Sequence, residues 1–172
     1  MTRFPMAAAA TIALATPLLA ESHTGPAAGA SLMTPDGTAA GQVEIFETVD
    51  GGTLFQVTLE GLPEGWHGFH VHETGQCGDD FAAAGDHYQG DGGEHGLLAG
   101  DAAHAGDLPN VYVNAEGMAM VHVHSARLTL EGGAAPMMDG DGSAIIVHES
   151  PDSYMQEAGA GGRIACGVIE AM

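Results

Sequence analysis

Apolar and polar residues alternate along most of this chain in short runs. Residues 42–48 and 54–60 show this period of two, and the Asp50-Gly51-Gly52 segment between them is typical of a β-hairpin turn. Further runs of the same kind lie at 31–33, 68–73, 111–113, 118–124, 128–130, 144–149 and 165–170. The pattern predicts about eight strands and no long helix, which is typical of an all-β sandwich or flattened barrel.

Two stretches interrupt this alternation. Residues 77–107 are rich in Gly, Asp, Ala and His and have little apolar periodicity. A loop of that length without regular structure is usually functional or disordered. The metal-ligand side chains within it favour function, with a metal ion organising the loop. Residues 150–162 form a second irregular segment, which leads into Arg163.

Histidines carry the candidate chemistry. His70 and His72 lie two residues apart in a predicted strand, so their side chains project from one face, about 6.6 Å apart along the chain. The long loop adds the number and type of ligands that a tetrahedral Zn²⁺ takes, in His87, His95, His104 and Asp107. His148 follows far downstream, and imidazole also suits copper. A single histidine is most often structural, but this many ligand-type residues together indicate a metal centre.

The start of the chain has the features of a secretory signal peptide. Arg3 is followed by an apolar run over 6–20, which is too short and too rich in small residues for a membrane span. We expect a signal peptide over 1–20, cleaved after Ala20 and less favourably after Ala15. A flexible N-terminal segment over 21–30 and a single domain over 31–172 would follow. The mature protein is expected to have no membrane association.

The chain contains two cysteines, Cys77 and Cys166. In the oxidising compartment that export implies, an even number of cysteines favours a disulfide over a pair of buried thiols. Closing a loop of this length would stabilise the fold by about 4–5 kcal/mol if the effect is the lost chain entropy of the unfolded state.

The charge balance is strongly acidic, with 23 acidic residues against three basic ones. Arg3 would leave with the signal peptide, so the mature chain would keep only Arg127 and Arg163 and has no lysine. This balance excludes nucleic acid and anionic membrane surfaces as favourable partners.

Several motifs, taken in order, resemble those of a copper/zinc superoxide dismutase of the bacterial periplasmic type. They are Gly68-Phe69-His70-Val71-His72-Glu73, His87, His95, His104-Ala105-Gly106-Asp107-Leu108, Val147-His148-Glu149 and Gly162-Arg163-Ile164-Ala165-Cys166-Gly167-Val168-Ile169. The resemblance covers residues 30–172. It implies a Greek-key barrel of about eight strands, a periplasmic location and superoxide as the substrate, and it allows a homodimer.

The resemblance also implies one copper ion and one zinc ion per subunit. The copper ligands would be His70, His72, His87 and His148, and the zinc ligands would be His87, His95, His104 and Asp107. The imidazole of His87 would then bridge the two metals. The disulfide Cys77–Cys166 would tie the ligand-bearing loop to the barrel.

The implied reaction converts superoxide into oxygen and hydrogen peroxide. Copper would cycle between its cupric and cuprous states, zinc would be structural, and His87 would take up and donate a proton. Arg163 would dock the anion beside the copper. Asp152 would link His70 to His95 and fix the orientation of both rings.

Two other functions compete with the enzyme. A periplasmic copper-binding or copper-buffering protein on the same scaffold needs the metal ligands but no anion-docking arginine, so Arg163 and Asp152 favour the dismutase. A zinc hydrolase is a weaker alternative, because no carboxylate is evidently placed as a general base beside an open zinc position.

Some histidines lie outside the metal pattern. His67, in the turn before the copper strand, is expected to be structural. Alternation places Met118, Met120, His122 and His124 on one face of a strand. That face is either an ordinary outer surface, packed in a dimer contact, or an accessory copper-capture patch, since Met and His suit copper. His23 would be the third residue after cleavage, where it either chelates Cu²⁺ with the free amine or is an idle tail residue.

Overall fold

A computed structural model describes residues 25–100 and 102–172. Its strands are β1 (Ala28–Met33), β2 (Ala39–Glu47), β3 (Thr53–Leu59), β4 (Gly65–His67), β5 (Phe69–His72), β6 (Val111–Val113), β7 (Ala119–Ser125), β8 (Ala144–His148), β9 (Arg163–Val168) and β10 (Glu170–Ala171). One 3-10 turn, Ala82–Ala84, is the only helical element among these residues. Every strand pair is antiparallel. The predicted all-β class is confirmed.

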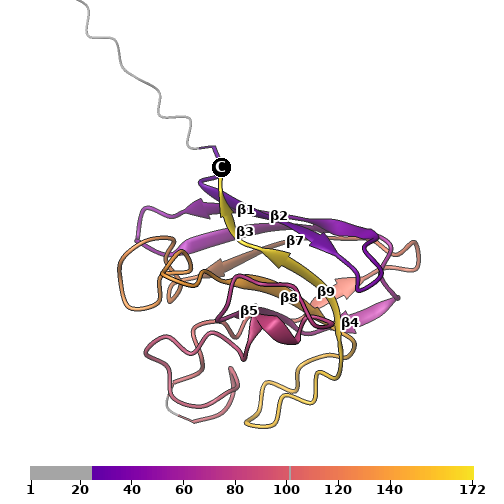
Figure 1. Cartoon of the computed structure of the whole chain (residues 1–172). Helices are drawn as coiled ribbons and strands as arrows, with labels where there is room; N and C mark the ends of the chain where they lie inside the picture. Colours follow the sequence, from indigo (N-terminus) through magenta and orange to yellow (C-terminus); the bar gives the residue numbers. More distant parts are fainter. Residues whose placement is uncertain (1–24, 101) are drawn as a thin grey trace, which may run out of the picture.

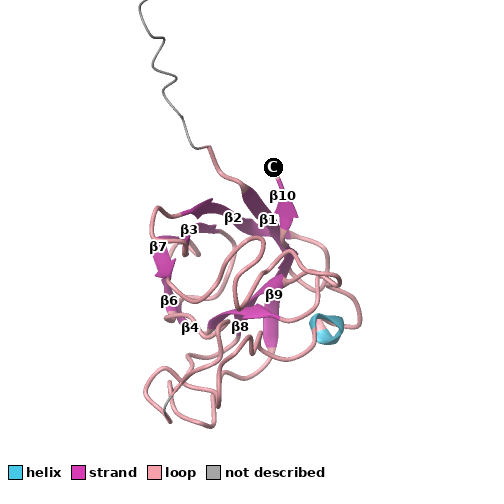
Figure 2. Ribbon diagram, turned by 90° about the vertical axis from the view of Figure 1, so that its left-hand side faces the viewer, coloured by secondary structure: helices cyan, strands magenta, loops and turns pink. Residues whose placement is uncertain are grey.

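The strands form a curled sheet in the order β5-β8-β9-β1-β2-β3-β7, with β10 beside β1. Strands β4 and β6 form a separate pair. Only Gly68 separates β4 from β5, and β6 contacts β7, so this pair fills the side of the barrel between β5 and β7. Figure 1 shows the sheet of β1, β2, β3 and β7 above that of β5, β8 and β9, and Figure 2 shows the ring of strands end on. The predicted flattened barrel is therefore confirmed.

The core lies between the two halves of the barrel. Phe55 and Val57 of β3 point inward, and Phe69 and Val71 of β5 meet them from the opposite side. The alternation that the sequence showed therefore has a direct cause, since every second residue of each strand is withdrawn from water. Gly41 lets β2 and β3 approach closely, because its φ is 125° and a Cβ there would lie 2.1 Å from the carbonyl oxygen of Thr58.

Three boundaries differ from the prediction. The segment 128–130 is not a strand, although Leu128 and Leu130 are buried, and its one bridge joins Thr129 to Pro136. Alternation there reflects burial of an irregular segment rather than strand pairing. The flexible segment was expected to end at residue 30, but β1 begins at Ala28, which pairs with β2 and β10. Strand β4 was missed because its sequence, Gly65-Trp66-His67, does not show the β-branched apolar residues that marked the equally short β6.

The predicted signal peptide over 1–20 and His23 lie outside the described residues, as does the rest of the segment up to residue 24. Within 25–100 and 102–172, no helix is long and apolar enough to cross a membrane.

The predicted disulfide between Cys77 and Cys166 is confirmed, with 5.8 Å between the two Cα atoms. Cys166 lies in β9, where it packs against Phe81 and Ile146 in a small second core. The bridge thus fastens the start of the long loop to the barrel, 89 residues away along the chain.

Removing the bridge by Cys77→Ala should lower the melting temperature by roughly 10 °C or more, because the unfolded chain regains the entropy of a long closed loop. Differential scanning calorimetry at neutral pH measures the effect. Gln76→Ala, an exposed neighbour whose backbone contacts do not depend on the side chain, is the control and should melt like the native protein. Equal melting temperatures for all three proteins would contradict this role.

Candidate metal centre

Strand β5 places two histidines on the outer side of the barrel. Phe69 and Val71 fill the core, so the alternating His70 and His72 point away from it, toward the loops. Both histidines are nonetheless buried, because the long loop covers them. The burial of all four β5 residues thus has two causes, the core on one face and the loop on the other.

Backbone pairing brings three further candidate ligands, His87, Asp107 and His148, to β5. Isolated bridges join His72 to His87 and His70 to Asp107. His148, the last residue of β8, follows Val147, which pairs with Phe69 of β5. Three distant parts of the chain therefore meet over β5.

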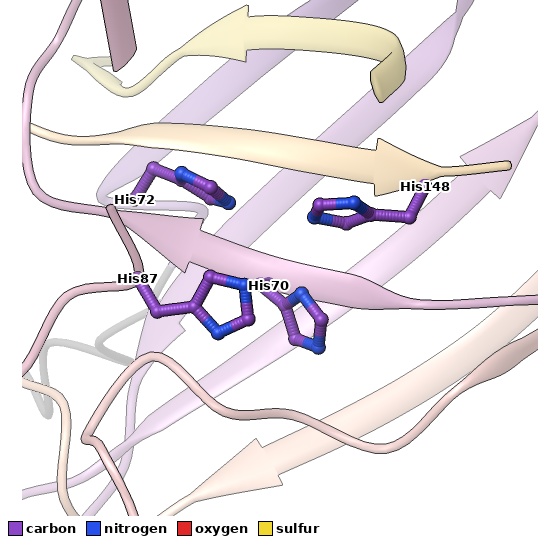
Figure 3. A group of neighbouring side chains, drawn as sticks. All are labelled: His70, His72, His87 and His148. Atoms are coloured by element: carbon purple, nitrogen blue, oxygen red, sulfur yellow. The ribbon is translucent and has the colours of Figure 1, made fainter. Parts of the chain in front are cut away.

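The four predicted copper ligands form one cluster, shown in Figure 3. They are His70, His72, His87 and His148, and one ring nitrogen of each lies within 4.8 Å of those of the others. The rings of His70 and His87 are 4.0 Å apart between centroids, and those of His72 and His87 are 4.9 Å apart. Two rings come from β5, one from the end of β8 and one from the loop.

One nitrogen of each barrel histidine is tied to an acceptor. His72 Nδ1 donates to the carbonyl oxygen of Gly85 at 2.9 Å, and His148 Nδ1 faces that of Gly161 at 3.4 Å. His70 Nε2 lies 2.7 Å from Asp152 Oδ2. These contacts place the proton on the tied nitrogen, so the opposite nitrogen of each ring keeps a free lone pair.

Burial keeps these rings uncharged. It lowers the pKa of His72 to about 2 and that of His148 to about 3, and the neighbouring histidines add to the effect. The pKa of His70 is lowered as well, mainly by burial. A neutral imidazole is the form that binds a metal ion, so at neutral pH these side chains are ready to act as ligands.

The free nitrogens fit a bound cation. His70 Nδ1, His72 Nε2 and His148 Nε2 are buried and have no hydrogen-bond partner among the described residues. Leaving such groups unpaired costs about 1–3 kcal/mol each. A metal ion bound to these three nitrogens and to His87 would remove that cost, and imidazole nitrogens are ligands that copper and zinc both accept.

A second group adjoins the first and consists of His87, His104 and Asp107. Asp107 is buried, its Oδ1 lies 2.9 Å from His87 Nδ1, and its Oδ2 accepts from the N–H groups of Gly96 and His104. His104 Nδ1 is another buried nitrogen without a partner in the described chain. His87 belongs to both groups, so one imidazole lies between two sets of ligands.

The fourth predicted zinc ligand, His95, lies beside this second group rather than within it. Its Nε2 is 3.5 Å from Asp107 Oδ1, and its Nδ1 is 2.8 Å from the carbonyl oxygen of Met155. The same Nε2 lies 2.9 Å from Asp152 Oδ2, which also contacts His70. Asp152 therefore stands between one ring of each set.

Two residues that the sequence analysis did not single out hold Asp152. The side chain of Asn110 bonds both the N–H and the carbonyl oxygen of Asp152, at 2.8 and 2.9 Å. The N–H of Tyr154 donates to Asp152 Oδ1 at 2.6 Å. Burial alone would raise the pKa of Asp152, but the bonds from His70 and Tyr154 outweigh it and lower the pKa to about 2. No spacing along the chain signals Asn110, because it meets Asp152 only in the folded loop.

Arg163 borders the histidine cluster. It opens β9 as the partner of His148 in the β8–β9 ladder. Its guanidinium donates to the carbonyl oxygens of Phe81 and Gly85, the latter at 2.6 Å, and Gly85 also accepts from His72. Burial lowers its pKa, yet the group stays charged because its ordinary value is so high. These two bonds occupy two of its five N–H donors, so the remaining N–H groups can bind an anion.

Arg127 has a role that the sequence did not suggest. It follows β7, and its guanidinium donates to the carbonyl oxygens of Ala103 at 2.7 Å and Asp107 at 3.2 Å. It therefore ties the backbone around Asp107 and His104 to the segment that follows β7. An isolated arginine after a strand carries no sequence signal for such a role.

The remaining histidines lie apart from the centre. His67 is buried between the carbonyl oxygens of His148 and Pro63, at 2.7 and 2.8 Å, so its contacts are structural. His122 and His124 are exposed on β7, and Met118 and Met120 are exposed on the same side.

Comparisons with known proteins agree with this geometry. Residues 39–169 match the family described as copper/zinc superoxide dismutase (SODC). A protein of Caulobacter vibrioides named superoxide dismutase [Cu-Zn] is 43% identical over 141 residues, which cover 78% of this chain and 80% of that protein.

Solved structures show the same likeness. The crystal structure of a SOD-like protein from Bacillus subtilis is 36% identical, has a TM-score of 0.76 and aligns with 81% of this chain and 96% of its own. The Cu/Zn superoxide dismutase from Brucella abortus is 33% identical, has a TM-score of 0.67 and aligns with 83% of this chain and 98% of its own. The chain belongs to the copper/zinc superoxide dismutase family, a family of enzymes, which confirms the resemblance that its motifs suggested.

Proposed function

We propose that this protein is an exported metalloenzyme that converts superoxide into oxygen and hydrogen peroxide. The observation that carries the proposal is the set of buried, unpaired nitrogens on His70, His72 and His148, gathered with His87 in a site bordered by Arg163. Ligands for a redox metal and a cation for an anionic substrate thus share one site.

In this proposal each subunit holds one copper ion and one zinc ion. Copper is held by the cluster of four histidines. Zinc is held by the second group, with His95 as the fourth ligand and His87 shared between both metals. When bound, copper supplies the one-electron oxidation and reduction, while zinc stays structural. His95 needs only a change in the direction of its ring to take part, since it already lies against Asp107.

The protein's own residues dock the substrate and handle protons. The half-buried Arg163 attracts superoxide and neutralises its charge. His87 has one nitrogen beside Asp107, so its Nε2 is the atom that accepts a proton and donates it to the reduced product. Asp152 acts through other residues, because it sets the ring orientations of His70 and His95.

A copper-binding or copper-buffering protein on the same scaffold is the alternative. The relative from Bacillus subtilis is named only SOD-like, and a shared fold does not by itself imply a shared activity. Storage requires the histidines but not a guanidinium held at the edge of the cluster by two carbonyl oxygens. Arg163 therefore favours the enzyme, and superoxide decay catalysed by the copper- and zinc-loaded protein tests it directly.

Export to the periplasm rests on the N-terminal pattern and is supported by the disulfide, which is stable in an oxidising compartment. A homodimer is also proposed. Trp66 of β4 and Tyr112 of β6 are exposed by 56% and 47% and pack against each other, with ring centroids 5.3 Å apart. Exposed aromatic pairs of this kind are enriched at protein interfaces, so the β4–β6 face is where the second subunit would pack.

His87→Ala should lower zinc retention and superoxide turnover together, because one imidazole serves both sets of ligands. Metal analysis after dialysis and a superoxide-decay assay measure the two effects. Gln89→Ala is the loop control, since its exposed amide contacts only the carbonyl oxygens of Gly92 and Gly93. The bridging assignment would be wrong if His87→Ala kept both metals and full turnover.

Asp152→Asn should weaken zinc binding about 10–100-fold, because the carboxylate that orients His95 loses its charge. Competition with a chromogenic chelator measures the affinity. Glu157→Gln removes an exposed carboxylate from the same loop and should bind zinc like the native protein. Native zinc affinity in Asp152→Asn would show that the carboxylate does not orient its neighbours.

Added salt should leave kcat/KM unchanged or increase it, and Arg163→Glu should nearly abolish turnover. Loss of Arg3 with the signal peptide takes the formal charge from −20 to −21, so the overall field repels superoxide. Arg127 does not offset this at the site, because its guanidinium binds the carbonyl oxygen of Ala103 in the loop. Salt screens that repulsion beyond about 8–10 Å. Stopped-flow superoxide decay between low and physiological ionic strength measures the dependence of kcat/KM on salt. A steep fall in rate with salt would falsify this account.

A further inference from the structure

The outer face of β7 carries a second pair of histidines at the same spacing as His70 and His72. Val121 and Val123 turn toward the core, so Met120, His122 and His124 point outward. Unlike β5, this face is not covered by any described loop, and Met120 is 86% exposed. In Figure 1, β7 lies in the upper sheet, whereas β5 lies in the lower one.

Strand register defines what surrounds these side chains. Across β3, Met120 pairs with Thr58, His122 with Gln56 and His124 with Leu54. The turn between β2 and β3 adds a carboxylate, because Asp50 Oδ2 lies 3.8 Å from His124 Nε2. Asp50 therefore lies at the His124 end of this row and Met120 at the opposite end, with His122 between them.

The charges around this face favour a cation. The described residues contain two basic side chains besides histidine, and both are engaged elsewhere: Arg127 with the carbonyl oxygens of Ala103 and Asp107, and Arg163 at the metal centre. Glu44, which pairs with Gln56 on the far side of β3, adds a negative charge to the row of His122. The carboxylates of Asp50 and Glu44 therefore attract a metal ion to this face.

The surface is less suited to a subunit contact. The exposed aromatic pair of Trp66 and Tyr112 lies on β4 and β6, whereas the row across β3 offers the polar Gln56 and Thr58. His122 and His124 are both exposed to water, so their ring nitrogens can reach a ligand from solvent. The buried core of a subunit interface is more apolar than this face.

We propose that His122 and His124 bind one additional transition-metal ion on the outer face of β7, with copper preferred. Asp50 contributes a third, anionic ligand to Cu²⁺, and the thioether of Met120 contributes a soft ligand to Cu⁺. Two imidazoles spaced by two strand residues, about 6.6 Å apart at the backbone, can turn toward one ion, and His70 and His72 at the same spacing on β5 belong to one group of ligand atoms. Copper is preferred because it binds nitrogen ligands more tightly than the other divalent ions of its row.

The experiment titrates Cu²⁺ into mature protein whose primary sites are already filled with copper and zinc, and follows the extra ion by equilibrium dialysis and electron paramagnetic resonance. The native protein should bind one further Cu²⁺ per chain with a distinct cupric spectrum. The double variant His122→Gln/His124→Gln should weaken that binding by about 100-fold or more, since even residues that only orient ligands contribute 10–100-fold. Turnover of superoxide should not change, so the result is independent of the proposed dismutase activity.

Three variants sharpen the result. His23→Gln removes the other candidate chelator and should leave the extra site intact. Asp50→Asn should weaken Cu²⁺ binding less than the double variant does. Met120→Leu should weaken Cu⁺ binding under ascorbate, whereas Met33→Leu, another exposed methionine on a strand, should not. The proposal is overturned if the double variant keeps native affinity, or if the extra ion is lost in His23→Gln alone.

Discussion

The attachment of the long loop to the free edge of β5 is the interaction on which the rest of the site depends. Besides bonds within itself, the loop pairs with β5 and the residue that follows it: Val71 donates to Gly106 and accepts from Tyr88, and Glu73 donates to Asp86. Bridges at His72–His87 and His70–Asp107 continue this pairing. Because the paired residues are themselves the ligands, the same contacts that order the loop also set the spacing of the metal centre. The disulfide and Arg127 then fasten the loop to the barrel at either end.

Burial of polar rings in such a site has a cost that the protein offsets only in part. Carbonyl oxygens and Asp152 bind one nitrogen of each barrel histidine, and the other nitrogen faces the interior of the site without a partner among the described residues. Those free nitrogens destabilise the metal-free site, and a bound metal ion would remove that cost. Metal binding and the order of the loop are therefore coupled. Asn110 and Tyr154 belong to the same system, because they hold the carboxylate that holds the rings.

The two faces of the barrel show how surroundings decide the use of one sequence pattern. His70 and His72 on β5 and His122 and His124 on β7 share the same spacing, and each pair alternates with core residues. A loop closes over the first pair, which lowers the pKa of His72 to about 2 and keeps its ring in the neutral form that binds a metal ion. The second pair stays open to water beside Asp50, which suits an ion that exchanges with solvent. The acidic, lysine-free chain favours cations at both places and leaves Arg163 alone to attract an anion.

The sequence by itself determined the barrel and the ligand types, because strand alternation records which residues leave water and because so many histidines, with Asp107, occur together in metal-ligand order. It also determined the pairing of two cysteines, since there is no third. It misjudged 128–130, where buried Leu128 and Leu130 imitate a strand, and it missed the three residues of β4. Only the tertiary structure decided how Asn110 and Arg127 support the centre, which nitrogen of each ring is free, and that His95 lies beside its set. These features depend on contacts between residues tens of positions apart, and such contacts leave no period along the chain.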